Sequence, residues 1–258
     1  MLKKRRQYKF LEKRCNAMQT HITDFVIKED FEALHELRVE IKKLRAFAAF
    51  AEKYTEGNFS KTLKPVIKIF KYAGRIRTAQ LNLQMIKKHK IGNADFINNQ
   101  QVFCQENSDK FKDSLKFYIN TIQKFCKKIK SKFHDIENKK IVVFYKKQLD
   151  FLKSFFQEEL DEKKLHECRK KIKLLLYMEN LLPKKVKQKL KLNKTYLDKL
   201  QDAIGKWHDA VLTAELLKTR NLTGEEKLKQ IFNKKNKLLQ TVKLLAKFFE
   251  EKVTRLPY

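Results

Sequence analysis

The chain has 258 residues, enough for one large domain or two small ones with a sizeable core. It carries 60 Lys and Arg against 30 Asp and Glu, a formal net charge of +30, and its hydrophobic fraction of 42% is too high for a disordered basic tail. With five Gly and three Pro, it has too few turn formers for a β-sandwich, a barrel or a Rossmann-type sheet, so we expect an all-α protein.

Helix signals alternate with short breaks along the whole chain. In its first part the pattern predicts helices over residues 3–26, from after Asp30 to a turn at Gly57 and Asn58, around Pro65, and over residues 74–89 before a loop at Gly92. Its second part reads as helices over residues 111–133, 139–159, 162–182, 185–204, 207–220 and 225–254. This succession predicts helical bundles.

Bulk features also indicate the setting. No segment approaches 18 consecutive apolar residues, so the sequence predicts no transmembrane helix. The basic start resembles that of a signal peptide, but no apolar stretch follows it, and we expect a cytoplasmic protein. The four cysteines, Cys15, Cys104, Cys126 and Cys168, form no CxxC or zinc-type spacing. They are expected to be reduced thiols, and we expect neither a metal site nor a cofactor.

Two separated blocks of the sequence recur at one offset. The first block is centred on His35 and recurs around His166, 131 residues later, and Gly74 recurs as Gly205 at the same offset. Because His and Gly are rare in this chain, such agreement indicates a tandem duplication. We therefore expect a single domain over residues 1–258 that consists of two halves, 1–104 and 105–258.

Each His-containing block places cations along one side of a helix. At about 100° per residue, His35, Arg38, Lys42 and Arg45 form a first stripe beside the apolar face, with Glu36 and Glu40 turned away from it. The second stripe repeats this pattern and consists of His166, Arg169, Lys170 and Lys173. Neighbouring like charges destabilise a helix, so two such stripes favour an anionic partner over a merely solvated face.

The sequence blocks that begin at Gly74 and Gly205 contain further basic residues. Arg75 and Arg77 follow Gly74, and Lys206 and His208 follow Gly205. A glycine before a helix start would offer backbone N–H groups and a positive dipole end to phosphate. A glycine at such a position is also a common close-packing site, so both interpretations stay open.

These motifs resemble those of a known family. The pattern His35-x-x-Arg38-x-x-x-Lys42-Lys43-x-Arg45, with its second copy at His166, is similar to the paired signature of the CHAD domain, the conserved histidine α-helical domain. Residues 200–209 resemble a second block of that family. Leu174 and Leu176 stand where the second motif usually has cations, and Thr78 replaces an Asp.

The resemblance implies two bundles of about four helices each, related by a pseudo-twofold axis. It also implies a basic groove or channel that binds inorganic polyphosphate, in the cytoplasm and on polyphosphate granules. The candidate binding residues are His35, Arg38, Lys42, Lys43, Arg45, Arg75, Arg77, His166, Arg169, Lys170, Lys173, Lys206 and His208.

Two alternatives remain at this point. Nucleic-acid binding would suit the charge, but aromatics such as Phe47, Phe50, Phe70 and Tyr72 are spaced for a helical core rather than for base stacking. A metal-dependent polyphosphate or triphosphate hydrolase would need carboxylates to hold its metal. The two stripes contain no acidic pair and the chain has no P-loop, so we expect a binding protein without catalysis.

Overall fold

The computed structural model describes residues 1–54, 58–158, 160 and 162–254, and these residues form an all-α protein. The fold class predicted from the sequence is therefore confirmed. The described residues contain no strand, only isolated bridges that pair Leu2 with Ile136 and Leu192 with Thr254. The chain divides into two compact units, unit 1 (Met1–Ile136) and unit 2 (Glu137–Tyr258).

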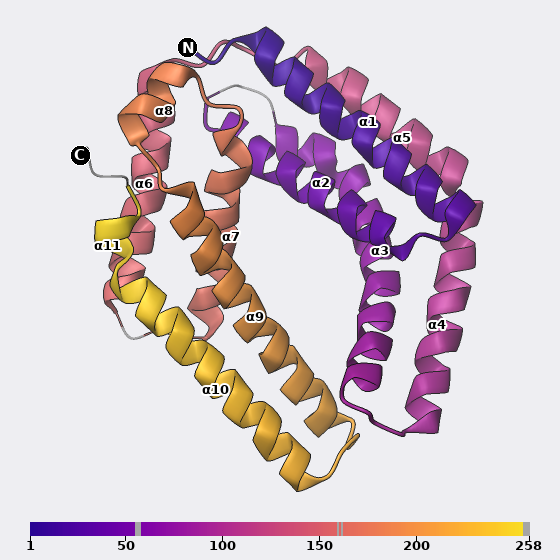
Figure 1. The fold of residues 1–258 in the computed structure, drawn as a ribbon. Helices are drawn as coiled ribbons and strands as arrows, with labels where there is room; N and C mark the ends of the chain where they lie inside the picture. The colour runs from indigo at the N-terminus through magenta and orange to yellow at the C-terminus, as the bar shows by residue number, and fades with distance from the viewer. Residues whose placement is uncertain (55–57, 159, 161, 255–258) are drawn as a thin grey trace. The chain divides into compact units, whose positions relative to one another are not determined.

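The described residues of unit 1 form five helices (Figure 1). They are α1 (Lys4–Lys28), α2 (Phe31–Ala51), α3 (Phe59–Lys88), α4 (Ala94–Asp113) and α5 (Leu115–Lys130). Helices α1 to α4 each pack on the next, and α5 packs on both α1 and α3. Because α5 packs within unit 1, this unit ends at Ile136. The boundary between the units therefore lies later in the sequence than the expected division between residues 104 and 105.

In the part of unit 2 that the structure describes, the chain forms six helices. They are α6 (Asn138–Gln157), α7 (Glu162–Glu179), α8 (Lys184–Leu190), α9 (Lys194–Thr219), α10 (Glu225–Lys247) and α11 (Phe249–Lys252). Helix α7 packs on α6 and α9, and α9 lies alongside α10 (Figure 1). The short helices α8 and α11 both contact α6.

Local sequence signals begin several of these helices. The side chains of Asp30, Asn58, Asn93 and Asn193 accept hydrogen bonds from backbone N–H groups in the first turns of α2, α3, α4 and α9. Such N-caps satisfy donors that have no partner inside the helix.

Two predicted boundaries are wrong. Helix α3 contains Pro65, as predicted, but it runs unbroken through Gly74, and α9 runs unbroken through Gly205. The real break in this part of unit 2 comes earlier, where Lys191 adopts a left-handed conformation at the end of α8. Helix α4 was not predicted, because its polar sequence shows little apolar periodicity. The predicted turn at Gly57 and Asn58 lies partly outside the described residues.

Aromatic residues occupy much of the core. In unit 1, Phe47 packs edge-on against Phe59 and Phe133, with ring centroids 6.3 and 5.5 Å away. In unit 2, Trp207 is 1% exposed, and the Tyr145 hydroxyl donates to the Leu175 carbonyl over 3.0 Å. Phe47 and Phe50 are core residues, as predicted.

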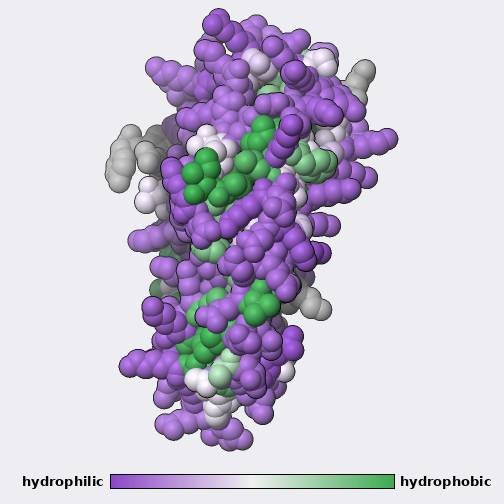
Figure 2. Space-filling model, turned by 90° about the vertical axis from the view of Figure 1, so that its right-hand side faces the viewer, coloured by the Kyte–Doolittle hydropathy of each residue, from purple (hydrophilic) through white to green (hydrophobic). Residues whose placement is uncertain are grey.

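Charge dominates the surface. Figure 2 shows one face on which hydrophilic residues surround separate hydrophobic patches. The exposed large hydrophobic residues of α4 and α5 are Val102, Phe103 and Phe117.

Candidate functional site

Helices α2 and α3 bring four basic side chains of unit 1 together. This unit 1 cluster consists of His35, Arg38 and Lys42 from α2 and Arg77 from α3. Burial lowers the pKa of His35, and the charges of Arg77 and Lys42 lower it further. Burial and the charge of Arg77 also lower the pKa of Arg38. The structure therefore holds these like charges close enough to act on one another.

Arg38 is held against the backbone of α3. Its Nη1 donates to the Phe70 carbonyl over 2.7 Å, and its guanidinium carbon lies 4.1 Å from the Phe70 ring centroid. A Cβ atom added to Gly74 would lie 2.1 Å from that Nη1. The glycine thus permits a close approach of Arg38 to the helix. Gly74 lies inside α3, so its interpretation as a helix start is wrong and its interpretation as a close-packing site is confirmed.

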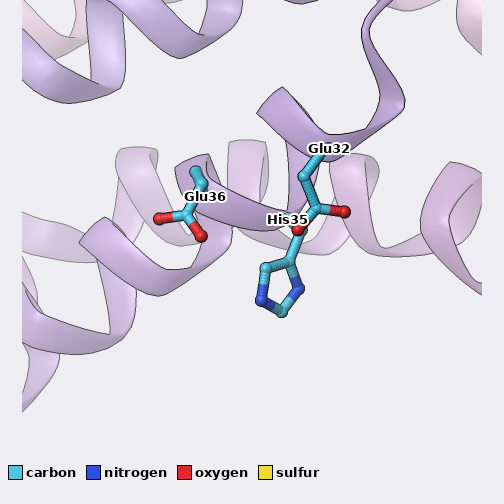
Figure 3. A group of neighbouring side chains, drawn as sticks. All are labelled: Glu32, His35 and Glu36. Carbon is cyan, nitrogen blue, oxygen red and sulfur yellow. The ribbon is translucent and has the colours of Figure 1, made fainter.

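Two carboxylates lie beside the unit 1 histidine. Figure 3 shows Glu32, His35 and Glu36 on one stretch of α2, and their ligand atoms all lie within 4.8 Å of one another. Glu32 also accepts from Nη2 of Arg77 over 3.3 Å. Both carboxylates favour protonated His35 but act against the larger effect of burial. This group was not predicted, because helical spacing places Glu36 away from the first stripe.

The group of Glu32, His35 and Glu36 has the donor types that bind a divalent cation. The positive charges of Arg77 and Lys42 act on the same histidine and oppose such a cation. The ion pair of Glu32 with Arg77 instead gives the carboxylate a local role in orienting that arginine.

Helices α7 and α9 build a comparable cluster in unit 2. This unit 2 cluster consists of His166, Arg169 and Lys173 from α7 and His208 from α9. Nε of Arg169 donates to the Gln201 carbonyl over 3.3 Å, and a Cβ atom added to Gly205 would lie 2.8 Å from Nη2 of Arg169. Gly205 lies inside α9, so this second glycine is also a close-approach position and not a helix start.

The two histidines of unit 2 lie side by side, with ring centroids 4.9 Å apart. Burial lowers the pKa of His166, and the charges of Lys170 and His208 act in the same direction. Nδ1 of His166 is buried and has no hydrogen-bond partner among the described residues. The neutral imidazole therefore keeps unused hydrogen-bonding capacity on its ring.

Lys173 lies partly inside the unit. Its Nζ donates to Oε1 of Gln201 over 3.3 Å. Burial lowers its pKa, Arg169 adds to that effect, and Asp202 and Asp198 oppose it. Gln201 thus supports both Arg169 and Lys173, a role that the sequence analysis missed. Gln201 lies four residues before Gly205 in the sequence, and that spacing is the feature from which its role could have been predicted.

The candidate cations that lie outside the two clusters differ in their surroundings. Lys43 pairs with Glu40 over 2.7 Å, and Lys170 pairs with Glu167 over 2.6 Å. An acidic residue therefore does pair with a cation of the second stripe, contrary to the sequence-based interpretation. The remaining candidates are exposed cations, and they are Arg45, Arg75 and Lys206.

Some aromatics predicted to lie in the core are only half-buried. The guanidinium carbons of Arg38 and Arg45 lie 4.1 and 5.8 Å from the Phe70 ring centroid, and that of Arg75 lies 5.8 Å from the Tyr72 ring centroid. Because these ring faces are occupied by arginines, the aromatics help to hold the cations in place.

Comparison with known families agrees with this arrangement. The family model of the CHAD domain matches residues 103–218, so this segment is similar to the CHAD domain family, as the motifs predicted. The matched segment contains the unit 2 cluster, whereas the unit 1 cluster precedes it. No curated protein matches the chain. None of the helices in the described residues has the length and apolar character needed to cross a membrane.

The family gives a coarse functional assignment. CHAD domains are associated with polyphosphate binding and are generally non-catalytic.

Proposed function

We propose that this protein binds inorganic polyphosphate through the unit 1 and unit 2 clusters. The observation that carries the proposal is the repeated arrangement of a histidine, an arginine and a lysine on one helix, completed by Arg77 or His208 from a packed neighbour. Burial makes the charged forms of these groups less favourable. A bound polyanion would compensate for that cost.

Polyphosphate suits the chemistry of the clusters. It is a flexible polymer with closely spaced phosphates and no bases to read. Arginine can donate to two phosphate oxygens at once, and lysine provides a compact charge. The imidazoles of His35 and His166 would donate hydrogen bonds, more strongly when protonated.

We further propose that the two clusters descend from an internal repeat. The hydrogen bonds from Arg38 to Phe70 and from Arg169 to Gln201 join residues that are all displaced by 131 positions. The same offset relates Gly74 to Gly205 and takes each of the helices α1, α2, α3 and α4 onto α6, α7, α9 and α10. Shared chain order, shared packing partners and a shared buried contact all support duplication.

The candidate residues differ in their proposed roles. Arg38, Arg169 and Lys173 bind phosphate from positions fixed by their own contacts with the neighbouring helix. Arg45, Arg75 and Lys206 are exposed and extend the positive surface around the clusters. Lys43 contributes less, since it pairs with the buried Glu40, whereas the pair of Lys170 with Glu167 is exposed and leaves Lys170 available to phosphate.

A binding titration with charge-matched variants tests the proposal. The variants R45A/R75A and K170A/K206A each remove two exposed cations next to a cluster, and K9A/K13A removes two exposed cations from α1. We expect R45A/R75A and K170A/K206A each to weaken polyphosphate binding by up to roughly tenfold, because exposed ion pairs contribute about 0.2–1 kcal/mol each. Equal losses in all three variants would mean that only net charge matters.

Trp207 offers a local readout for that titration. It is the only tryptophan of the chain, and its ring centroid lies 6.3 Å from that of His208. Polyphosphate bound at the unit 2 cluster should therefore change the tryptophan fluorescence. K9A/K13A should retain this change, and K170A/K206A should require more polyphosphate to reach it.

Two further measurements separate the alternatives. Competition between polyphosphate and single-stranded DNA at equal phosphate and salt concentrations should favour polyphosphate, and a preference for DNA would support a nucleic-acid-binding function. Incubation of polyphosphate with the protein and Mg²⁺ or Mn²⁺ should release no phosphate. Sustained release that is lost in E32Q/E36Q would instead assign a hydrolase reaction to the carboxylates beside His35.

A further inference from the structure

Two cysteines from distant parts of the sequence meet between α1 and α5. These helices pack together in unit 1 and lie side by side in Figure 1. Nε2 of Gln123 donates to Oε1 of Gln19 over 3.2 Å, and Nζ of Lys130 lies 4.2 Å from the Tyr8 ring centroid. These two contacts show that α1 and α5 are antiparallel to one another. Along each helix, Cys15 on α1 and Cys126 on α5 lie between the two contacts. Each thiol is also the largest influence on the pKa of the other, which places the two sulfurs next to one another.

The two thiols have unequal surroundings. Cys15 is 1% exposed, whereas Cys126 is only half-buried. A hydrogen bond from the Cys15 thiol lowers the pKa of Cys126 to about 7, against the effect of burial and with help from Lys130. The same contact and burial raise the pKa of Cys15. Cys126 is therefore the accessible thiolate of the pair, and Cys15 is a protonated thiol held next to it.

We propose that Cys15 and Cys126 are a redox modification site, at which a hydroperoxide converts the two thiols into a reversible disulfide that ties α1 to α5. The Cys126 thiolate attacks one peroxide oxygen, the O–O bond breaks, and the released oxygen leaves as water after taking up a proton. The resulting Cys126 sulfenic acid is attacked by the Cys15 sulfur, which forms the S–S bond and releases a second water. Two thiols and one hydrogen peroxide thus give one disulfide and two waters.

The other cysteines provide an internal contrast. Burial raises the pKa of Cys104, and burial raises the pKa of Cys168 to about 12. Neither has another thiol among the groups that shift its pKa. The expectation of free, reduced cysteines agrees with all four in this structure. Their scattered spacing in the sequence did not reveal that two of them meet.

The test uses the full-length chain with the variant C104S/C168S, which keeps only the proposed pair. After treatment with hydrogen peroxide at neutral pH, we expect the monomer to lose two thiols and to yield a proteolytic peptide pair that is cross-linked through Cys15 and Cys126. A thiol reductant should reverse the link. The wild-type chain, treated in parallel, should give the same cross-link while Cys104 and Cys168 remain reduced.

Single replacements then distinguish the steps. C126S should abolish the link and slow peroxide consumption, whereas C15S should leave a Cys126 sulfenic acid that dimedone traps. The linked monomer should also unfold at a higher temperature than the reduced one, because a cross-link restricts the unfolded chain. Oxidation of wild type to a sulfinic acid without a cross-link, or links only between separate chains, would overturn the proposal.

Discussion

At the scale of single residues, the histidines couple the candidate function to pH. Burial is the main cause that lowers the pKa of His35 and His166 below its ordinary value of 6.5. In the absence of an anion both rings are therefore neutral at pH 7. A bound polyanion favours the imidazolium form and raises the pKa, so binding takes up protons.

Polyphosphate affinity should accordingly rise as the pH falls from 8 towards 5.5. Each unit by which the anion raises a histidine pKa adds about tenfold in affinity once the pH lies below the free-state pKa. Titrations over this pH range should show a weaker dependence in H35Q and H166Q, whereas H134Q replaces an exposed histidine and should behave like wild type. A pH-independent affinity in the wild type would contradict a role for either ring.

The same histidines affect stability with the opposite sign. Their pKa is lower in the folded than in the unfolded state, so the unfolded chain binds more protons below about pH 6.5. Without polyphosphate, the free energy of unfolding is therefore highest above this pH and falls as the pH falls through the folded-state pKa values. Polyphosphate should oppose that loss.

At the scale of helices, the glycines decide how closely an arginine approaches the next helix. In G74A the new Cβ would overlap Nη1 of Arg38, which lies at the flexible end of its side chain. The guanidinium can move away, and alanine favours a helix over glycine by roughly 0.5–1 kcal/mol. The stability of G74A should thus change by no more than about 1 kcal/mol.

Polyphosphate affinity of G74A should nevertheless fall by about tenfold, because Arg38 loses its fixed position. Thermal unfolding and a binding titration measure the two effects separately. G92A is the matched control, since no atom lies within 4 Å of a Cβ at that position. Unchanged affinity in G74A would show that the contact of Arg38 with Phe70 is purely structural.

A buried ion pair fixes α1 on α2. Nη1 of Arg14 lies 2.9 Å from Oε2 of Glu40, and their side chains are 13% and 7% exposed. Replacement of Glu40 by Gln leaves the buried arginine without its counter-charge, which typically costs about 3 kcal/mol. Urea unfolding of E40Q should show such a loss. E167Q breaks an exposed pair and should change stability by less than about 1 kcal/mol; a comparable loss in both variants would contradict this distinction.

At the scale of the whole molecule, the net charge of +30 favours a polyanionic partner, and the number of phosphates that the protein neutralises sets the salt dependence of binding. Release of counterions makes the logarithm of the binding constant fall with the logarithm of salt concentration, by about 0.7 for each phosphate neutralised on a single-stranded polyanion. We expect a steep line for the wild type. R45A/R75A should give a shallower slope than K9A/K13A, and a flat response in wild type would exclude electrostatic capture.

Several features were predictable because they depend on local sequence. The low content of Gly and Pro, together with helical periodicity, determined the all-α class. The spacing of Arg38 and Lys42 after His35 placed all three on one side of α2, as the structure confirms. The family resemblance was also available from these motifs and is confirmed over residues 103–218.

Other features depended on contacts between distant segments. From the sequence, Gly74 could mark either a helix start or a place where a side chain closely approaches the helix. Only the position of Arg38 in the structure shows that it is a place of close approach. In the same way, Glu32 reaches Arg77 across two helices, and Cys15 meets Cys126 across more than a hundred residues. The sequence by itself determined which residue types lie on each helix face, because side-chain periodicity is a property of one segment. The tertiary structure decided which of these side chains are buried, paired or placed beside a second cation, because helix packing brings together groups whose separation along the chain carries no such information.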